Sequence, residues 1–199
     1  MTHYIPSHDL AFIHVPKTGG TSILKWIEQN FDYNKIASKH ANIFEFTGRK
    51  YGSHSRPKNY FTVVRNPYHR ILSWYYYQDK MLNKRLEKNK PRENDNELKK
   101  LLEVGINDSF TGEKSALYDK NILKPQTKFY DADIKFILYQ ENLVNDFKKI
   151  QKFTNCYKDL PFENKSKNSN NVNILNEKTI KLINEIYSDD FKILGYKKI

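Results

Sequence analysis

The 199-residue sequence contains a single cysteine, Cys156, so no internal disulfide can stabilise the fold. Nothing near Cys156 marks it as a nucleophile, and packing is its expected role. Histidine, cysteine and acidic residues are nowhere clustered with metal-ligand spacing. We therefore expect chemistry that requires no metal, in a protein compatible with a reducing compartment.

Long apolar runs are also missing. The first fifteen residues lack a basic segment, and their apolar stretch is too short for a signal peptide or a membrane span. We therefore expect no transmembrane segment and a cytoplasmic protein of bacterial type. The Golgi lumen is the alternative if the sequence is a truncated eukaryotic protein.

Acidic residues are scarce, with 23 Asp and Glu against 34 Lys and Arg, so the net charge is +11. A basic surface suits an anionic partner such as a nucleotide, an acidic glycan, a nucleic acid or a membrane surface. AT-biased coding, which enriches Lys and Asn, is an equally good explanation. The mean hydropathy is low at −0.80, yet the 14% aromatic content argues against disorder. One domain over residues 1–199 is expected.

Short apolar segments followed by helical patterns indicate the fold class. Strands are predicted at 10–15, 60–64 and 134–139, each followed by a helix, at about 21–31, from 67 past 77, and at 141–153. Residues 32–58 are expected to be mostly loop with a short helix near 40–46, and helices are predicted near 95–104 and at 177–187. Repeated strand–helix units predict an α/β fold with a central parallel sheet and helices on both faces. Ligands bind such sheets beyond the carboxyl ends of the strands.

The sequence HVPKTGGTS, residues 14–22, lies at the first of these ends. Gly19 and Gly20 permit positive φ and close backbone approach, and a helix that starts here directs main-chain N–H groups at the loop. Lys17 adds a charge, while hydroxyls come from Thr18, Thr21 and Ser22. The segment is typical of an anion-binding loop, and an ordinary tight turn is the alternative. A Walker A motif would place the lysine after the glycines, which weakens the ATPase interpretation.

A second corner of the same kind follows the strand at 60–64. Arg65 lies just beyond the strand, where its guanidinium can bind a phosphate in forked geometry, and Asn66 and Pro67 can begin a helix. Ser73 lies about two turns into that helix. A structural ion pair for Arg65 and a helix-packing role for Ser73 are the alternatives.

Together, PKTGGTS and VVRNPYHRILSWY resemble the sulfotransferases that use 3′-phosphoadenosine 5′-phosphosulfate (PAPS), closest to the Golgi and bacterial carbohydrate branch. Later segments resemble the family in the same order: PQTKFYD (125–131), FILYQENLVNDFKKI (136–150), LPFENKSKNSN (160–170) and DDFKILGY (189–196). The resemblance is weakest over 80–120. It implies the sulfotransferase fold, a three-layer α/β sandwich with a central parallel sheet, similar to P-loop NTPases.

The resemblance also implies the roles of individual residues. The loop for the 5′-phosphosulfate of PAPS matches Lys17, Thr18, Gly19, Gly20, Thr21 and Ser22. The contacts to the 3′-phosphate match Arg65 and Ser73. Lys165 and Ser166 resemble a late segment that closes over the nucleotide, although a solvated loop is as good an interpretation. PAPS is then the co-substrate, 3′,5′-ADP the product, and Lys17 the group that stabilises the leaving phosphate.

The base that deprotonates the acceptor is expected to be a histidine, because imidazole titrates near neutral pH. His40 resembles the family segment that carries a proposed base, and His54 is its rival. Glu45 remains an alternative, because some members of the family use a carboxylate. A solvated loop is the alternative for either histidine.

The expected acceptor is a hydroxyl of a carbohydrate, with an acidic polysaccharide as one candidate. A nucleotide kinase or NTPase is the alternative enzyme, since the predicted sheet suits either. Nucleic acid is not an expected partner, because the aromatic residues fall on predicted core faces. The sequence gives no oligomeric state.

Overall fold

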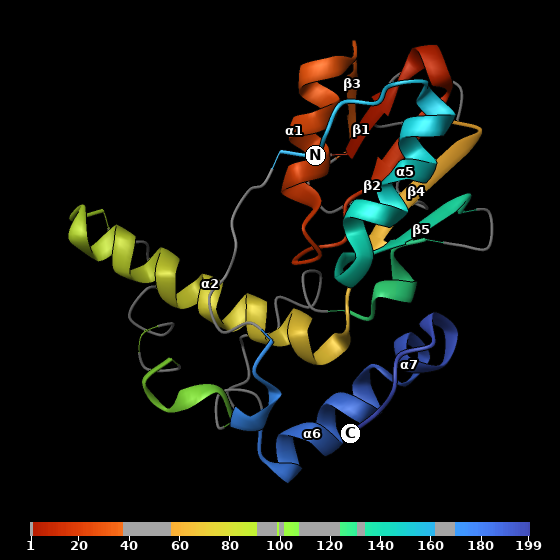
Figure 1. The fold of residues 1–199 in the computed structure, drawn as a ribbon. Helices are drawn as coiled ribbons and strands as arrows, with labels where there is room; N and C mark the ends of the chain where they lie inside the picture. The colour runs from red at the N-terminus through yellow and green to blue at the C-terminus, as the bar shows by residue number, and fades with distance from the viewer. Residues whose placement is uncertain are drawn as a thin grey trace. The chain divides into compact units, whose positions relative to one another are not determined.

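The computed structural model describes residues 2–37, 57–90, 99, 102–107, 124–130, 134–161 and 170–199. The chain divides into two compact units (Figure 1). The first comprises Met1–Arg65 and Lys124–Lys165, and the second comprises Asn66–Leu123 and Ser166–Ile199. The expectation that residues 1–199 act as one domain stays a prediction.

A five-stranded sheet lies in the first unit, in the order β3-β1-β2-β4-β5. Its strands are β1 (Thr2–Ile5), β2 (Leu10–Ile13), β3 (Asn34–Ala37), β4 (Asn59–Val64) and β5 (Phe136–Tyr139). β2, β4 and β5 run parallel, whereas β1 is antiparallel to both of its neighbours. The α/β class and the three predicted parallel strands are confirmed, but the sheet is mixed. β1 and β3 were not predicted, because THYI and NKIA are too short and too polar to stand out as strands.

Helices α1 (Gly20–Asn30) and α5 (Leu143–Thr154) pack on one face of this sheet. Their apolar side chains share a buried core with alternate residues of β2 and β4, such as Phe12 and Phe61. The Trp26 ring meets Phe147 edge-on, with centroids 4.8 Å apart, and so joins the two helices. The residues in between on these strands, such as Ala11 and Thr62, are buried as well. Burial on both faces is the pattern of a central strand in a layered α/β fold.

The second unit contains α2 (Pro67–Glu87), α6 (Glu177–Ile186) and α7 (Ser188–Leu194). The Asn66 side chain caps α2 by accepting from the N–H of Tyr68, as predicted, and Asn176 caps α6 in the same way. α6 matches the helix predicted at 177–187, whereas α7, which begins directly after Tyr187, was not predicted. Short 3₁₀ turns complete the described elements: η1 (Pro6–His8), η4 (Gln126–Lys128), η5 (Gln140–Asn142) and η6 (Val172–Ile174).

Candidate functional site

The carboxyl ends of the three parallel strands meet at one edge of the first unit. Ile13 of β2 pairs with Thr62 of β4, and Val64 of β4 pairs with Tyr139 of β5. The segments that follow these strands are therefore neighbours at this edge (Figure 1). They are the PKTGGTS loop (residues 16–22), Arg65 and η5.

The PKTGGTS loop has a strained, internally bonded backbone. Lys17 and Gly19 both adopt left-handed conformations, with φ of 67° and 90°. Positive φ was predicted for a glycine, but in Lys17 it is unusual and costs of order 1 kcal/mol. The Thr18 hydroxyl is buried and donates to the Val15 carbonyl at 2.8 Å. Thr18 therefore shapes the loop with its side chain, leaving its main chain as the part that can face a ligand.

Gly20 begins α1 at a point where no side chain fits. A Cβ at this position would lie 2.3 Å and 2.5 Å from two ring atoms of His14, which is itself buried beside Phe12. Gly19 precedes it as the N-cap, and no described side chain caps the helix. The first turn of α1 thus presents main-chain N–H groups and the positive end of the helix dipole. Lys17, half-buried, adds a full positive charge.

Arg65 lies against this loop. Its Nη1 donates to the main-chain carbonyl of Lys17 at 3.3 Å, and the side chain is buried. A guanidinium has five N–H donors, so this contact is compatible with a second, forked contact to a phosphate. The two corners identified in the sequence therefore meet within the first unit, and together they concentrate positive charge at one edge of the sheet. These residues fit the anionic groups of a nucleotide donor.

Two glutamines at this edge were missed by the sequence analysis. The Gln126 side chain accepts from the Arg65 N–H at 2.8 Å and donates to the Arg65 carbonyl at 2.7 Å. Gln140 lies beside Gly19, because a Cβ on Gly19 would be 3.7 Å from its Cγ. Gln126 falls in the PQTKFYD segment, so its place in the family order could have drawn attention to it. Gln140 falls in the segment FILYQENLVNDFKKI, so the same signal could have marked it.

The other predicted site residues lie in the second unit or outside the described residues. Ser73 is buried in α2 of the second unit. His40, His54, Lys165 and Ser166 lie outside the described residues. Their predicted roles stay predictions.

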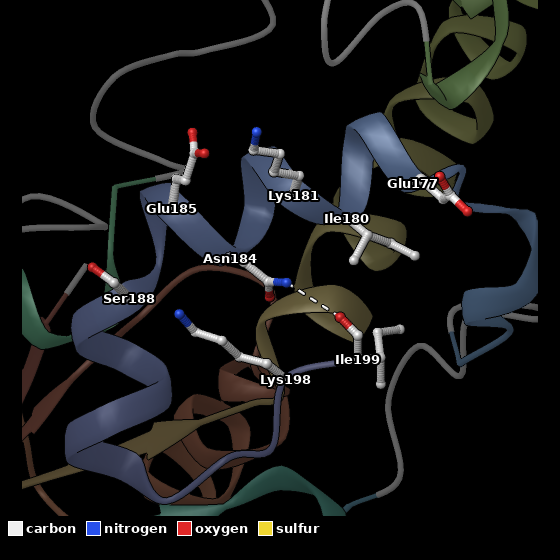
Figure 2. Close-up of a pocket in the computed structure, with 8 residues that line it drawn as sticks. All are labelled: Glu177, Ile180, Lys181, Asn184, Glu185, Ser188, Lys198 and Ile199. Carbon is white, nitrogen blue, oxygen red and sulfur yellow. Dashed lines mark hydrogen bonds between the residues drawn. The ribbon is translucent and has the colours of Figure 1, made fainter.

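A cavity of about 690 Å³ lies in the second unit, along α6 and the last residues of the chain. Figure 2 shows the Asn184 side chain at its floor, donating to the Ile199 carbonyl at 3.2 Å. None of the predicted site residues lines it; the lining residues are Glu177, Ile180, Lys181, Asn184, Glu185, Ser188, Lys198 and Ile199. The residues that line this pocket are therefore different from those of the PKTGGTS loop.

Among the described residues there is neither a metal-binding cluster nor a membrane-spanning helix. No group of three or more His, Cys, Asp or Glu residues is arranged to hold a metal ion within that part of the chain. Among the helices of the same residues, none has the length and apolar content needed to cross a membrane.

Comparison with known proteins gives one match. The model of the sulfotransferase family matches residues 2–197. No curated protein and no solved structure matches the chain. The family match supersedes the nucleotide kinase alternative. Since the match covers nearly the whole sequence, the chain belongs to the sulfotransferase family and is a PAPS-dependent enzyme that transfers a sulfuryl group to a hydroxyl-bearing acceptor.

Proposed function

We propose that this sulfotransferase moves the sulfuryl group of PAPS to a hydroxyl of a carbohydrate, by in-line attack. Support comes from the contact between Arg65 and the Lys17 carbonyl, which brings the two phosphate-binding corners within reach of one nucleotide. The loop at 16–22 binds the 5′-phosphosulfate end, where an uncapped helix terminus and Lys17 supply positive charge. Arg65 binds the 3′-phosphate, with Ser73 as its partner.

Sulfuryl transfer places negative charge on the oxygen that bridges sulfur and the 5′-phosphate. Because positioning and charge stabilisation dominate in such transfers, Lys17 is the group that stabilises the leaving phosphate. Loop residues Thr18, Gly19, Gly20, Thr21 and Ser22 hold that phosphate. Lys165 and Ser166 close over the nucleotide. We propose that no metal takes part.

The proton of the acceptor hydroxyl passes to a histidine, and His40 is the preferred candidate over His54. The proposal rests on the family resemblance of the segment around His40 and on the titration range of imidazole. The net charge of +11 supports an acidic polysaccharide as one acceptor.

The experiment that tests this function combines a transfer assay with a binding measurement. Labelled PAPS is offered with acidic polysaccharides and with neutral glycans, and labelled product is counted for the wild type and for Lys17→Ala. The variant is expected to lose on the order of 10²–10³-fold in kcat, while 3′,5′-ADP binding stays measurable. Near-normal turnover in Lys17→Ala contradicts its role, and labelling of no glycan at all contradicts the carbohydrate acceptor.

The same assay separates the two candidate bases. His40→Ala is expected to lower kcat steeply without changing the affinity for 3′,5′-ADP, and His54→Ala is its matched control. A steep loss in His54→Ala alone reverses the assignment.

A further inference from the structure

Gln126 makes a pair of hydrogen bonds that resembles one more step of a β-ladder. The ladder between β4 and β5 ends at the Val64–Tyr139 pair, so the place opposite the next residue, Arg65, lies beyond it. The Gln126 side-chain amide takes that place: its Oε1 accepts from the Arg65 N–H at 2.8 Å, and its Nε2 donates to the Arg65 carbonyl at 2.7 Å. Both main-chain groups of Arg65 are thereby satisfied by a single side chain.

The amide is held firmly. Gln126 is fully buried and begins η4, whose turn is closed by bonds from the Lys128 and Phe129 N–H groups at 3.0 Å. Phe129 is also fully buried. Because packing fixes the main chain of η4, the Gln126 amide has a defined position. Its two hydrogen bonds can therefore restrict the main chain of Arg65.

The position of the Arg65 main chain restricts where its guanidinium can lie. That guanidinium donates to the Lys17 carbonyl at 3.3 Å. A chain of hydrogen bonds therefore connects Gln126 through Arg65 to Lys17, the residue of the PKTGGTS loop with the strained backbone. All three residues belong to the first unit. Loss of the amide would leave the buried N–H and carbonyl of Arg65 to find new partners, and the side chain would move with them.

We propose that Gln126 is a positioning residue for the donor site, which aims Arg65 at the 3′-phosphate of the nucleotide through its two main-chain bonds. This inference rests on the proposed role of Arg65. It makes Gln126 a determinant of donor recognition that touches no donor atom.

The test compares two ligands that differ only in the 3′-phosphate. Dissociation constants for 3′,5′-ADP and 5′-AMP are measured by titration calorimetry for the wild type, Gln126→Leu, Arg65→Ala and the double variant. Gln126→Leu keeps the side chain's size but removes both bonds. It is expected to weaken 3′,5′-ADP by about 10-fold and 5′-AMP by much less. Because both changes act on one contact, the double variant should lose little more than Arg65→Ala alone.

Thr62→Val is the matched control. Thr62 is equally buried in the same unit and donates to the Ile13 carbonyl at 2.8 Å, away from Arg65. Its loss should lower the unfolding temperature and leave the ratio of the two dissociation constants unchanged. If Gln126→Leu does not fold, Gln126→Glu, which retains the acceptor oxygen, is expected to show a smaller change in the same ratio.

The outcomes separate the inference from the function on which it rests. If Arg65→Ala alters the ratio but neither Gln126 variant does, Gln126 is merely structural and the inference is overturned. If Arg65→Ala leaves the ratio unchanged, Arg65 does not bind the 3′-phosphate. That result contradicts the proposed function, and with it the inference that rests on it. Additive losses in the double variant also overturn the inference.

Discussion

The loop before α1 and the first residue of this helix have backbone conformations and contacts that few side chains can adopt. Lys17 and Gly19 have positive φ, and Gly20 lies directly against the buried His14 ring. Strain of this kind persists only where surrounding contacts hold it, and it concentrates at binding sites. Such a backbone is suited to a close approach between main-chain N–H groups and an anion.

Gly20→Ala tests this close approach. The added Cβ would lie 2.3 Å from the His14 ring, so either the ring or the start of α1 must shift. We expect a loss of about 1–3 kcal/mol in the free energy of unfolding, measured with urea, and weaker 3′,5′-ADP binding. In a His14→Ala background the ring is absent, and the same substitution should cost much less. An equal cost in both backgrounds would show that His14 does not limit the space.

At the residue scale, the sequence predicted which residue types form the loop. It did not predict their backbone angles or their contacts. The pattern PKTGG predicted a glycine with positive φ, and Gly19 confirms it. It did not predict the left-handed Lys17, because that conformation follows from the contacts of the folded loop. Gln126 was missed for a related reason: its bonds to Arg65 join residues 61 positions apart, which no local pattern encodes.

The elements were predictable where their signals are local. Continuous apolar runs predicted β2, β4 and β5, and asparagine caps predicted where α2 and α6 begin. β1 and β3 were missed because their pairing, rather than their composition, makes them strands. The end of α6 before the break at Tyr187 was predicted, but α7 beyond it was missed, because a helix of 7 residues is too short to show a helical period.

The second unit buries charged and phenolic groups at that break. Arg70, Tyr187 and Asp190 are fully buried. Burial lowers the pKa of the Arg70 guanidinium, against the opposing effect of Asp190. Burial likewise raises the pKa of Tyr187 well above its ordinary value of 10.0. Neutral Tyr187 is thus favoured in the folded state.

A dependence of stability on alkaline pH follows from Tyr187. Its pKa is raised on folding, so above pH 10 the unfolded chain loses a proton that the folded chain keeps, and stability falls as pH rises. Tyr187→Phe removes this contribution. Between pH 10 and pH 11 the stability advantage of the wild type over the variant should shrink by about 1 kcal/mol in urea unfolding. Tyr157→Phe, at an exposed ring, is the control, and an equal change in both variants would contradict the assignment.

At the scale of the whole molecule, the family match over residues 2–197 and the contact between two sequence-distant corners point to the same chemistry. The family was predictable because its two motifs are local and correctly spaced after strands. The acceptor was not, because no motif in the sequence identifies it. The proposed function therefore requires that the loop at 16–22 and Arg65 bind opposite ends of a single PAPS molecule.

A crystal structure of the protein with 3′,5′-ADP tests that claim most directly. The account predicts the 5′-phosphate within hydrogen-bond distance of the main-chain N–H groups at the start of α1 and of Lys17 Nζ. It predicts the 3′-phosphate in forked contact with Arg65. A nucleotide bound with its 3′-phosphate away from Arg65, or one bound outside the PKTGGTS loop, would contradict it.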